Sequence, residues 1–197
     1  MRISIIGAGV MGEALIAALI KAGHTPEHIE IIEKRQERCD ELVSKYSIKV
    51  GKDLSNSDVL LLVTKPQDVD GVLADINGKV KPGSLVVSFA AGKKISTISK
   101  GLNGQNPVVR VMPNTPTLVG KGAAGFSLGS GVTEHQKKFV IDFLTAAGVA
   151  VEVDETLQDA VTATSGSGPA YFFAFVESMV KGAVDLGLSE EVATQLT

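Results

Sequence analysis

Short apolar runs alternate with helix-like stretches over the first 153 residues of this chain. Strands are predicted at residues 3–6, 29–33, 58–63, 85–89, 108–112 and 148–153, and helices at 13–22, 35–46, 70–76, 95–102 and 134–147. Strands that alternate with helices of this length form βαβ units with a parallel sheet. The sequence therefore predicts an α/β fold with a Rossmann-like doubly wound sheet, which binds ligands along the carboxyl ends of its strands.

The pattern changes after residue 153. The glycine-rich piece at 120–131 carries no predicted element, whereas the last part of the chain is helical, with helices predicted at 155–163, 170–186 and 190–197. Ser165-Gly166-Ser167-Gly168-Pro169 predicts a break between the first two of these helices. We therefore expect a sheet domain over residues 1–153 and, over 154–197, the beginning of an all-α domain that continues past Thr197.

Composition excludes several kinds of partner. With 19 Lys and Arg against 22 Asp and Glu, a net charge of −3 and no Trp, the chain is not built to bind nucleic acid. No apolar run approaches the roughly 18 residues of a membrane span. The single Cys39 and the scattered His24, His28 and His135 predict a reduced thiol, surface histidines, no metal site and a cytoplasmic protein.

A glycine-rich turn joins the first strand to the first helix. Gly7-Ala8-Gly9-Val10-Met11-Gly12 matches G-x-G-x-x-G, and an acidic residue, Glu33, ends the next strand about twenty positions later. In such a turn Gly7 makes the bend, Gly9 lets a pyrophosphate approach the backbone, and Gly12 lets helix and strand pack. The helix start supplies free N–H groups and a positive dipole. These residues predict a dinucleotide-binding loop.

The residues after the second strand bear on which dinucleotide is bound. The Glu33 carboxylate can accept from a ribose 2′-OH and so favours NAD, whereas Lys34 and Arg35 can attract the 2′-phosphate of NADP. The two cations can equally be the solvated start of a helix. Both cofactors remain open at this point.

Three further segments end strands at the same edge. Thr64-Lys65-Pro66 follows one strand, Ala91-Gly92 the next, and Asn114 the strand after that. Lys65 is a cation placed for a substrate carboxylate or a cofactor ribose, with a plain surface lysine as the alternative. Asn114 is a ligand of the nicotinamide or the cap of a turn.

The glycine turn and four further strings together resemble one family. The four strings are KPQ at 65–67, SFAAG at 88–92, RVMPNTP at 110–116 and DAVTATSGSGPAY at 159–171. Taken in order, they resemble the pyrroline-5-carboxylate reductase family over the whole chain. The resemblance implies NAD(P)H-dependent reduction of 1-pyrroline-5-carboxylate to L-proline, the last step of proline biosynthesis. It also implies that residues 1–153 are an NAD(P)-binding Rossmann domain and residues 154–197 the first part of a helical dimerisation and substrate domain. The partners it implies are this small substrate and, through the helical domain, a second copy in a homodimer or larger homo-oligomer, without nucleic acid or membrane.

The resemblance also implies a cofactor and a role for individual residues. The cofactor is NADP (NADPH), with NAD as the alternative. Lys65 becomes a positioning residue rather than a committed general acid, because no His or Cys lies at any motif. The substrate-binding residues it implies are Glu155, Ser165, Gly166, Ser167 and Gly168. The cofactor-binding residues it implies are Gly7, Ala8, Gly9, Val10, Met11, Gly12, Glu33, Lys34, Arg35, Thr64, Lys65, Pro66, Ala91, Gly92 and Asn114.

Several departures and alternatives accompany this resemblance. The family usually has a small or polar residue and then Arg after the second strand, where this chain has Glu33-Lys34, and an Asn expected before the strand at 58–63 has no clear match. A Ser-Pro-Gly-Gly-x-Thr loop that binds the substrate carboxylate in the family is not among these 197 residues. The alternatives are a cofactor-binding fragment or regulatory module without turnover, and another imine or β-hydroxyacid reductase.

Overall fold

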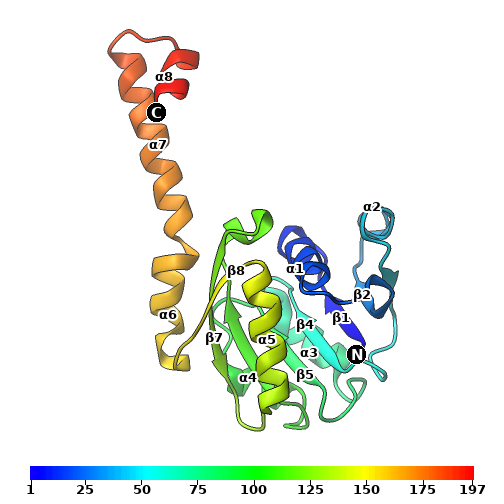
Figure 1. Ribbon diagram of the computed structural model, residues 1–197. Coiled ribbons are helices and arrows are strands. Elements are labelled where there is room, and N and C mark those ends of the chain that lie inside the picture. Colours follow the sequence, from blue (N-terminus) through cyan, green and yellow to red (C-terminus); the bar gives the residue numbers. More distant parts are fainter.

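A computed structural model describes all residues, 1–197. One sheet of eight strands carries helices on both faces, and the last helices extend away from it (Figure 1). The fold is Rossmann-like α/β, as predicted. None of the helices combines the length with the apolar character that a membrane span requires.

The strands lie in the order β3-β2-β1-β4-β5-β6-β7-β8. All neighbouring pairs are parallel except β6 and β7. The strand order reverses between β1 and β4, which is where a doubly wound sheet opens its ligand crevice. The bounds are β1 Ile3–Ile6, β2 Ile29–Ile32, β3 Lys49–Val50, β4 Val59–Leu62, β5 Leu85–Ser88, β6 Val108–Met112, β7 Gly122–Leu128 and β8 Gly148–Glu152.

Two hydrophobic cores cover the two faces of the sheet. One face packs on α1, α2 and α5, with Leu15, Leu42 and Phe143 among its buried side chains. The other face packs on α3 and α4, through residues such as Leu73 and Ile98. The helix bounds are α1 Val10–Lys21, α2 Gln36–Tyr46, α3 Val69–Ile76, α4 Ile95–Gly101 and α5 Glu134–Ala146.

The sequence analysis missed β7, which lies inside the glycine-rich piece at 120–131. Its residues carry little strand propensity, but their small size is required by packing. A Cβ on Gly125 would lie 2.7 Å from a methyl group of Val161, so a glycine here lets the helical segment lie directly on the strand. The two-residue β3 is exposed and was also missed.

The predicted break at residues 165–169 is seen in part: the α-helix gives way to a π-helical stretch, one turn residue, Ser167, follows, and a new α-helix starts at Gly168. After α6 (Gln158–Val161) comes one π-helical stretch, η5 (Thr162–Gly166), and then α7 (Gly168–Asp185) and α8 (Glu190–Leu196). The hydroxyls of Thr162 and Thr164 donate to carbonyls four residues back, at 2.9 and 2.8 Å. Pro169 falls in the first turn of α7, where its missing N–H costs nothing.

The long helix α7 extends away from the sheet, in orange at one side of Figure 1, and has no buried residue. Its large apolar side chains face solvent, with Phe172 73% and Phe173 63% exposed. Soluble chains rarely leave so much contiguous apolar surface uncovered. This helix therefore presents an unpartnered face.

Cys39 is buried, and one of the three histidines that were predicted on the surface is half-buried. The Cys39 thiol is buried between α2 and the sheet, and burial raises its pKa. His28 and His135 are exposed as predicted, but His24 is half-buried against the Phe139 ring, and burial lowers its pKa.

Candidate active site

The strand register brings the predicted cofactor residues to one edge of the sheet. Ile6 pairs with Ile32 of β2 and Leu62 of β4, Leu62 pairs with Ser88 of β5, and Ser88 with Arg110 of β6. The loops that follow these strands therefore begin side by side. They contain the glycine loop (residues 7–12), Glu33, Thr64, Lys65, Pro66, Ala91, Gly92 and Asn114.

The three glycines of the loop have distinct surroundings. Gly7 has a φ of +91°, and a Cβ there would lie 2.8 Å from the Val63 carbonyl oxygen. A Cβ on Gly12 would collide with the Gly7 carbonyl, whereas a Cβ on Gly9 would meet nothing within 4 Å. Protein packing requires the first and third glycines. The second leaves the backbone open on the ligand side.

The start of α1 has the properties of an anion site. Its N-cap residue, Gly9, is extended and supplies no side-chain cap to the first turn of this 12-residue helix. The N–H groups at such a helix start need acceptors, and the helix dipole favours a negative charge there. With the open space at Gly9, these features fit the pyrophosphate of a dinucleotide.

Glu33 lies at the end of β2, beside the loop. Its carboxylate accepts from the backbone N–H of Ala8 at 3.0 Å and from the backbone and side chain of Arg35, each at 3.1 Å. Burial alone would raise the pKa of Glu33, but the hydrogen bonds from Arg35 and Ala8 outweigh it and lower the pKa. The carboxylate is therefore ionised, and it lies at the strand end where an acidic residue of such a fold hydrogen-bonds an adenosine ribose. Lys34 is exposed, and the ion pair of Glu33 is with Arg35.

Thr64 supplies an unsatisfied group at the same edge. Its hydroxyl oxygen is buried and has no hydrogen-bond partner in the protein. Its backbone N would lie 3.2 Å from a Cβ on Gly7, so the residue is next to the glycine loop. A buried polar atom without a partner costs about 1–3 kcal/mol, and a bound ligand that hydrogen-bonds it removes that cost. This atom fits a cofactor that covers the loop. The neighbouring Lys65 and Pro66 are exposed.

The next strand end is also open. Gly92 has a φ of +72° and nothing within 4 Å of a Cβ position, and Ala91 before it is half-buried. A left-handed glycine in a turn lets a ligand approach the backbone closely. Ala91 and Gly92 therefore leave space at the end of β5.

Asn114 joins the sheet to the helical segment. Its amide nitrogen donates to the carbonyl of Ser165 at 3.1 Å, and its amide oxygen accepts from the Ala123 N–H at 2.8 Å. A Cβ on Gly166 would lie 2.8 Å from the terminal carbon of Met112, so the π-helical stretch rests on the end of β6. This contact brings Ser165 and Gly166 to the edge that holds the cofactor residues. Ser167 and Gly168 follow at the start of α7.

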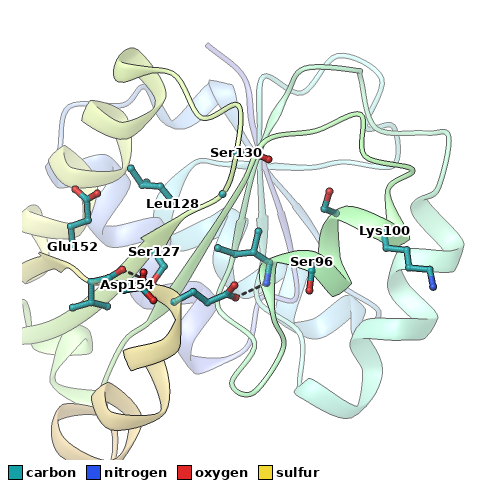
Figure 2. Close-up of a pocket in the computed structure, with 12 residues that line it drawn as sticks. Ser96, Lys100, Ser127, Leu128, Ser130, Glu152 and Asp154 are labelled. Carbon is teal, nitrogen blue, oxygen red and sulfur yellow. Dashed lines mark hydrogen bonds between the residues drawn. The ribbon is translucent and has the colours of Figure 1, made fainter.

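Glu155, the remaining predicted substrate residue, lies in a different cavity from the glycine loop. Its carboxylate accepts from the Ile95 N–H at 2.6 Å and lies 3.5 Å from the Arg110 guanidinium. It lines an open cavity of about 1040 Å³, in which α4 supplies Ser96 and Lys100 on one side and residues after β8 supply Asp154 on the other (Figure 2). No residue of the glycine loop lines this cavity. Of the predicted site residues, Glu155 alone does.

Two arginines with structural roles were not identified from the sequence. Arg38 of α2 reaches the glycine loop and donates to the Ala8 carbonyl at 2.9 Å. Arg110 is buried in β6 next to Glu155. Arg110 had a usable signal, because it is one charge inside an apolar strand. Arg38 had none, since it stands among other charged residues of an exposed-looking helix.

Comparisons with known proteins agree with this geometry. The family model described as NADP oxidoreductase coenzyme F420-dependent matches residues 2–92, and that described as pyrroline-5-carboxylate reductase dimerisation matches residues 155–197. The two matches cover the sheet edge with the glycine loop and the projecting helices. They assign a family description to each part of the chain.

Relatives and solved structures match over nearly the whole chain. The pyrroline-5-carboxylate reductase of Corynebacterium melassecola is 41% identical over 98% of this chain and 74% of the relative, and that of Methanosarcina acetivorans is 40% identical over 99% and 74%. The structure of the Coxiella burnetii pyrroline-5-carboxylate reductase is similar, with a TM-score of 0.89 and 31% identity over 99% of this chain and 74% of the other. A Plasmodium falciparum pyrroline carboxylate reductase with NADP bound has a TM-score of 0.84 and 28% identity over 100% and 74%. On these matches and on the site geometry, this chain belongs to the pyrroline-5-carboxylate reductase family.

Proposed function

We propose that this chain is an NAD(P)H-dependent reductase that converts 1-pyrroline-5-carboxylate to L-proline in the cytoplasm, as the last step of proline biosynthesis. The observation that carries the proposal is the sheet edge itself. It combines an uncapped helix start, open space at Gly9 and an unsatisfied Thr64 hydroxyl in a chain of this family. NADPH is the proposed cofactor, with NADH as the alternative.

The cofactor-binding residues surround the place that such a dinucleotide would take. The N–H groups that follow Gly9 would bind the pyrophosphate, and Glu33 with Lys34 and Arg35 would meet the adenosine ribose. Thr64, Lys65, Pro66, Ala91, Gly92 and Asn114 would line the nicotinamide side. The bound cofactor supplies a hydride for the imine carbon of the substrate.

The hydrogen bonds of η5 support one way in which the substrate would be held. The Ser165 hydroxyl donates its proton to the Val161 carbonyl at 3.2 Å, so toward a ligand it can act only as an acceptor. A protonated imine carries an N–H and accepts hydride more readily than a neutral one. We infer that Ser165 accepts from that N–H, while Lys65 attracts the substrate carboxylate. Catalysis then comes from orientation and charge rather than from a dedicated acid.

Each of the two parts of the chain would have its own role. Residues 1–153 would form the NAD(P)-binding domain, and residues 154–197 would belong to a helical dimerisation and substrate domain. The exposed apolar face of α7 supports assembly with a second copy as a homodimer or larger homo-oligomer. Glu155, Ser165, Gly166, Ser167 and Gly168 are the proposed substrate-side residues.

Two measurements on the 197-residue chain test the proposal. Binding of NADPH and NADH by calorimetry tests the cofactor, and oxidation of either in the presence of 1-pyrroline-5-carboxylate, with proline as the detected product, tests the reaction. Binding with proline formation is the expected result. Binding without turnover would favour a cofactor-binding module, and turnover of other imines or of β-hydroxyacids in preference to this substrate would favour a different reductase.

A further inference from the structure

One side chain of α2 crosses to the back of the glycine loop. Arg38 donates from Nε to the Ala8 carbonyl oxygen at 2.9 Å and from a terminal nitrogen to the Gly9 carbonyl oxygen at 3.5 Å. Its side chain is only 14% exposed. Two consecutive carbonyls of the loop are thus held by one planar guanidinium, thirty residues further along the chain.

The charge of Arg38 is already neutralised by its surroundings. Its guanidinium pairs with Glu13 of α1 and with Glu41 at 2.7 Å. Glu13 in turn accepts from Lys45 at 2.7 Å and from the Tyr46 hydroxyl at 3.1 Å. The hydrogen bond from Lys45 comes first among the causes that lower the pKa of Glu13 to about 2, so this carboxylate is ionised at neutral pH. Two cations face two anions, so long-range attraction for a phosphate is small.

The geometry of the peptide bond gives these contacts a consequence on the other side of the loop. In a trans peptide the C=O and the following N–H point in opposite directions within one plane. Holding the Ala8 carbonyl toward α2 therefore turns the Gly9 N–H away from α2, and holding the Gly9 carbonyl does the same for the Val10 N–H. These are the N–H groups at the uncapped start of α1.

We propose that Arg38 is a positioning residue for the cofactor: it holds the Ala8 and Gly9 peptides with their N–H groups aimed at the pyrophosphate before the dinucleotide arrives. Elsewhere in the loop the Gly7 N–H is bonded to the Ile32 carbonyl and the Ala8 N–H to Glu33, while the Gly9 carbonyl also accepts from the Glu13 N–H at 2.9 Å. Arg38 reinforces the Gly9 carbonyl, and the orientation of the Ala8 carbonyl depends on it most. Fixing the bound conformation in advance removes an entropy cost from binding. This inference rests on the proposed function, since it assumes a dinucleotide at this loop.

The test compares Arg38→Lys and Arg38→Met with Lys45→Met in the full chain. Lysine keeps the charge but cannot bond both carbonyls and Glu13 in one plane. Lys45 also bonds Glu13 but touches no loop carbonyl, so Lys45→Met is the matched control. The dissociation constant of ADP-ribose, which has the pyrophosphate but no nicotinamide, is measured by calorimetry, and circular dichroism checks that each variant is folded.

The expected result is at least a roughly tenfold weaker binding of ADP-ribose and NADPH by both Arg38 variants, with Lys45→Met within about twofold of the wild type. In turnover, Arg38→Lys should raise the KM for the cofactor and leave kcat nearly unchanged, because the lost binding is equal in the ground state and the transition state. Equal affinity of Arg38→Lys and the wild type would overturn the inference. Equal losses in all three variants would overturn it too, because the network rather than the carbonyl contacts would then matter. A wild-type chain that binds no ADP-ribose would instead refute the proposed function.

Discussion

Asn114 and Ser165 connect the sheet to the projecting helices through one side chain. The Asn114 amide donates to the Ser165 carbonyl at 3.1 Å and accepts from the Ala123 N–H at 2.8 Å. Asn114 follows β6, Ala123 is in β7, and Ser165 lies in η5. The side chain therefore fixes η5 against the end of the sheet.

Asn114→Asp should destabilise the fold. The acceptor for the Ala123 N–H is kept, but the donor to the Ser165 carbonyl becomes an oxygen that repels it, so this partly buried carbonyl loses its partner. The expected loss in the free energy of unfolding is about 1–3 kcal/mol, measured in urea. Gln36→Ala, which removes an exposed amide bonded to Asp40, should change it by less than about 0.5 kcal/mol. Equal stability of Asn114→Asp and the wild type would show that the carbonyl finds another donor.

Alanine at two loop glycines should have opposite effects. In Gly9→Ala the new Cβ meets no protein atom and φ is −65°, so stability should stay within about 0.5 kcal/mol of the wild type, while the methyl group occupies the proposed pyrophosphate space. In Gly12→Ala the Cβ collides with the Gly7 carbonyl, so the fold itself should lose about 1–3 kcal/mol. Thermal unfolding and NADPH affinity, measured side by side, check the contrast. Full NADPH affinity in Gly9→Ala would remove the loop from the proposed site.

Glu33→Ser should shift the cofactor preference toward NADPH. The Glu33 carboxylate is held ionised by Arg35 and the Ala8 N–H, so it repels a 2′-phosphate placed at the ribose position. Its removal frees Arg35 for that phosphate. The ratio of kcat/KM with NADPH to that with NADH should rise by at least about tenfold. An unchanged ratio in steady-state assays would mean that Glu33 turns away from the cofactor.

Glu13→Gln should lower stability at neutral pH and not at strongly acid pH. The pKa of Glu13 falls from 4.5 to about 2 in the folded chain. A lowered pKa stabilises the fold above the unfolded pKa, and this contribution is lost as pH falls from 4.5 toward 2. Since the side chain is partly solvated, the difference between wild type and variant should be about 1–3 kcal/mol at pH 7. Urea unfolding across this pH range measures it, and a difference that does not depend on pH would contradict the assignment.

Much of the sheet and the cofactor edge was predictable, because both depend on local pattern. Buried parallel strands such as β4 are apolar throughout, and the glycine turn follows a strand and starts a helix. The strand-end loops then meet at one edge by the topology of a parallel sheet alone. The resemblance of the later strings added the family.

The parts that the sequence did not predict depend on contacts between distant residues. Gly125 of β7 must be small because Val161, far along the chain, packs on it. The sequence indicated the interruption at residues 165–169 but not the π-helical stretch η5 before it, in which the Thr162 and Thr164 hydroxyls bond carbonyls four residues back. Arg38 acts on a loop thirty residues earlier, and no local pattern marks such a contact.

Arg110 and Glu155 provide a last prediction at the second junction between sheet and helices. The Arg110 side chain is 6% exposed and lies 3.5 Å from Glu155 and 3.6 Å from Asp159. Asp159 is 94% exposed, so water screens it and its pairing contributes little. Glu155 is the better-buried partner and also accepts from the Ile95 N–H at 2.6 Å.

Glu155→Gln keeps the shape of the side chain but leaves the buried guanidinium without its main counter-charge. The free energy of unfolding should fall by about 1–3 kcal/mol, less than for a fully buried pair because Glu155 is 31% exposed, and Asp159→Asn should change it by less than about 0.5 kcal/mol. Adding Arg110→Met to Glu155→Gln should restore part of the loss, since an apolar side chain of similar length no longer needs a counter-charge. The free energy of unfolding of Glu155→Gln and of the double variant is compared in urea. A double variant that is less stable than Glu155→Gln alone would show that Arg110 has another partner.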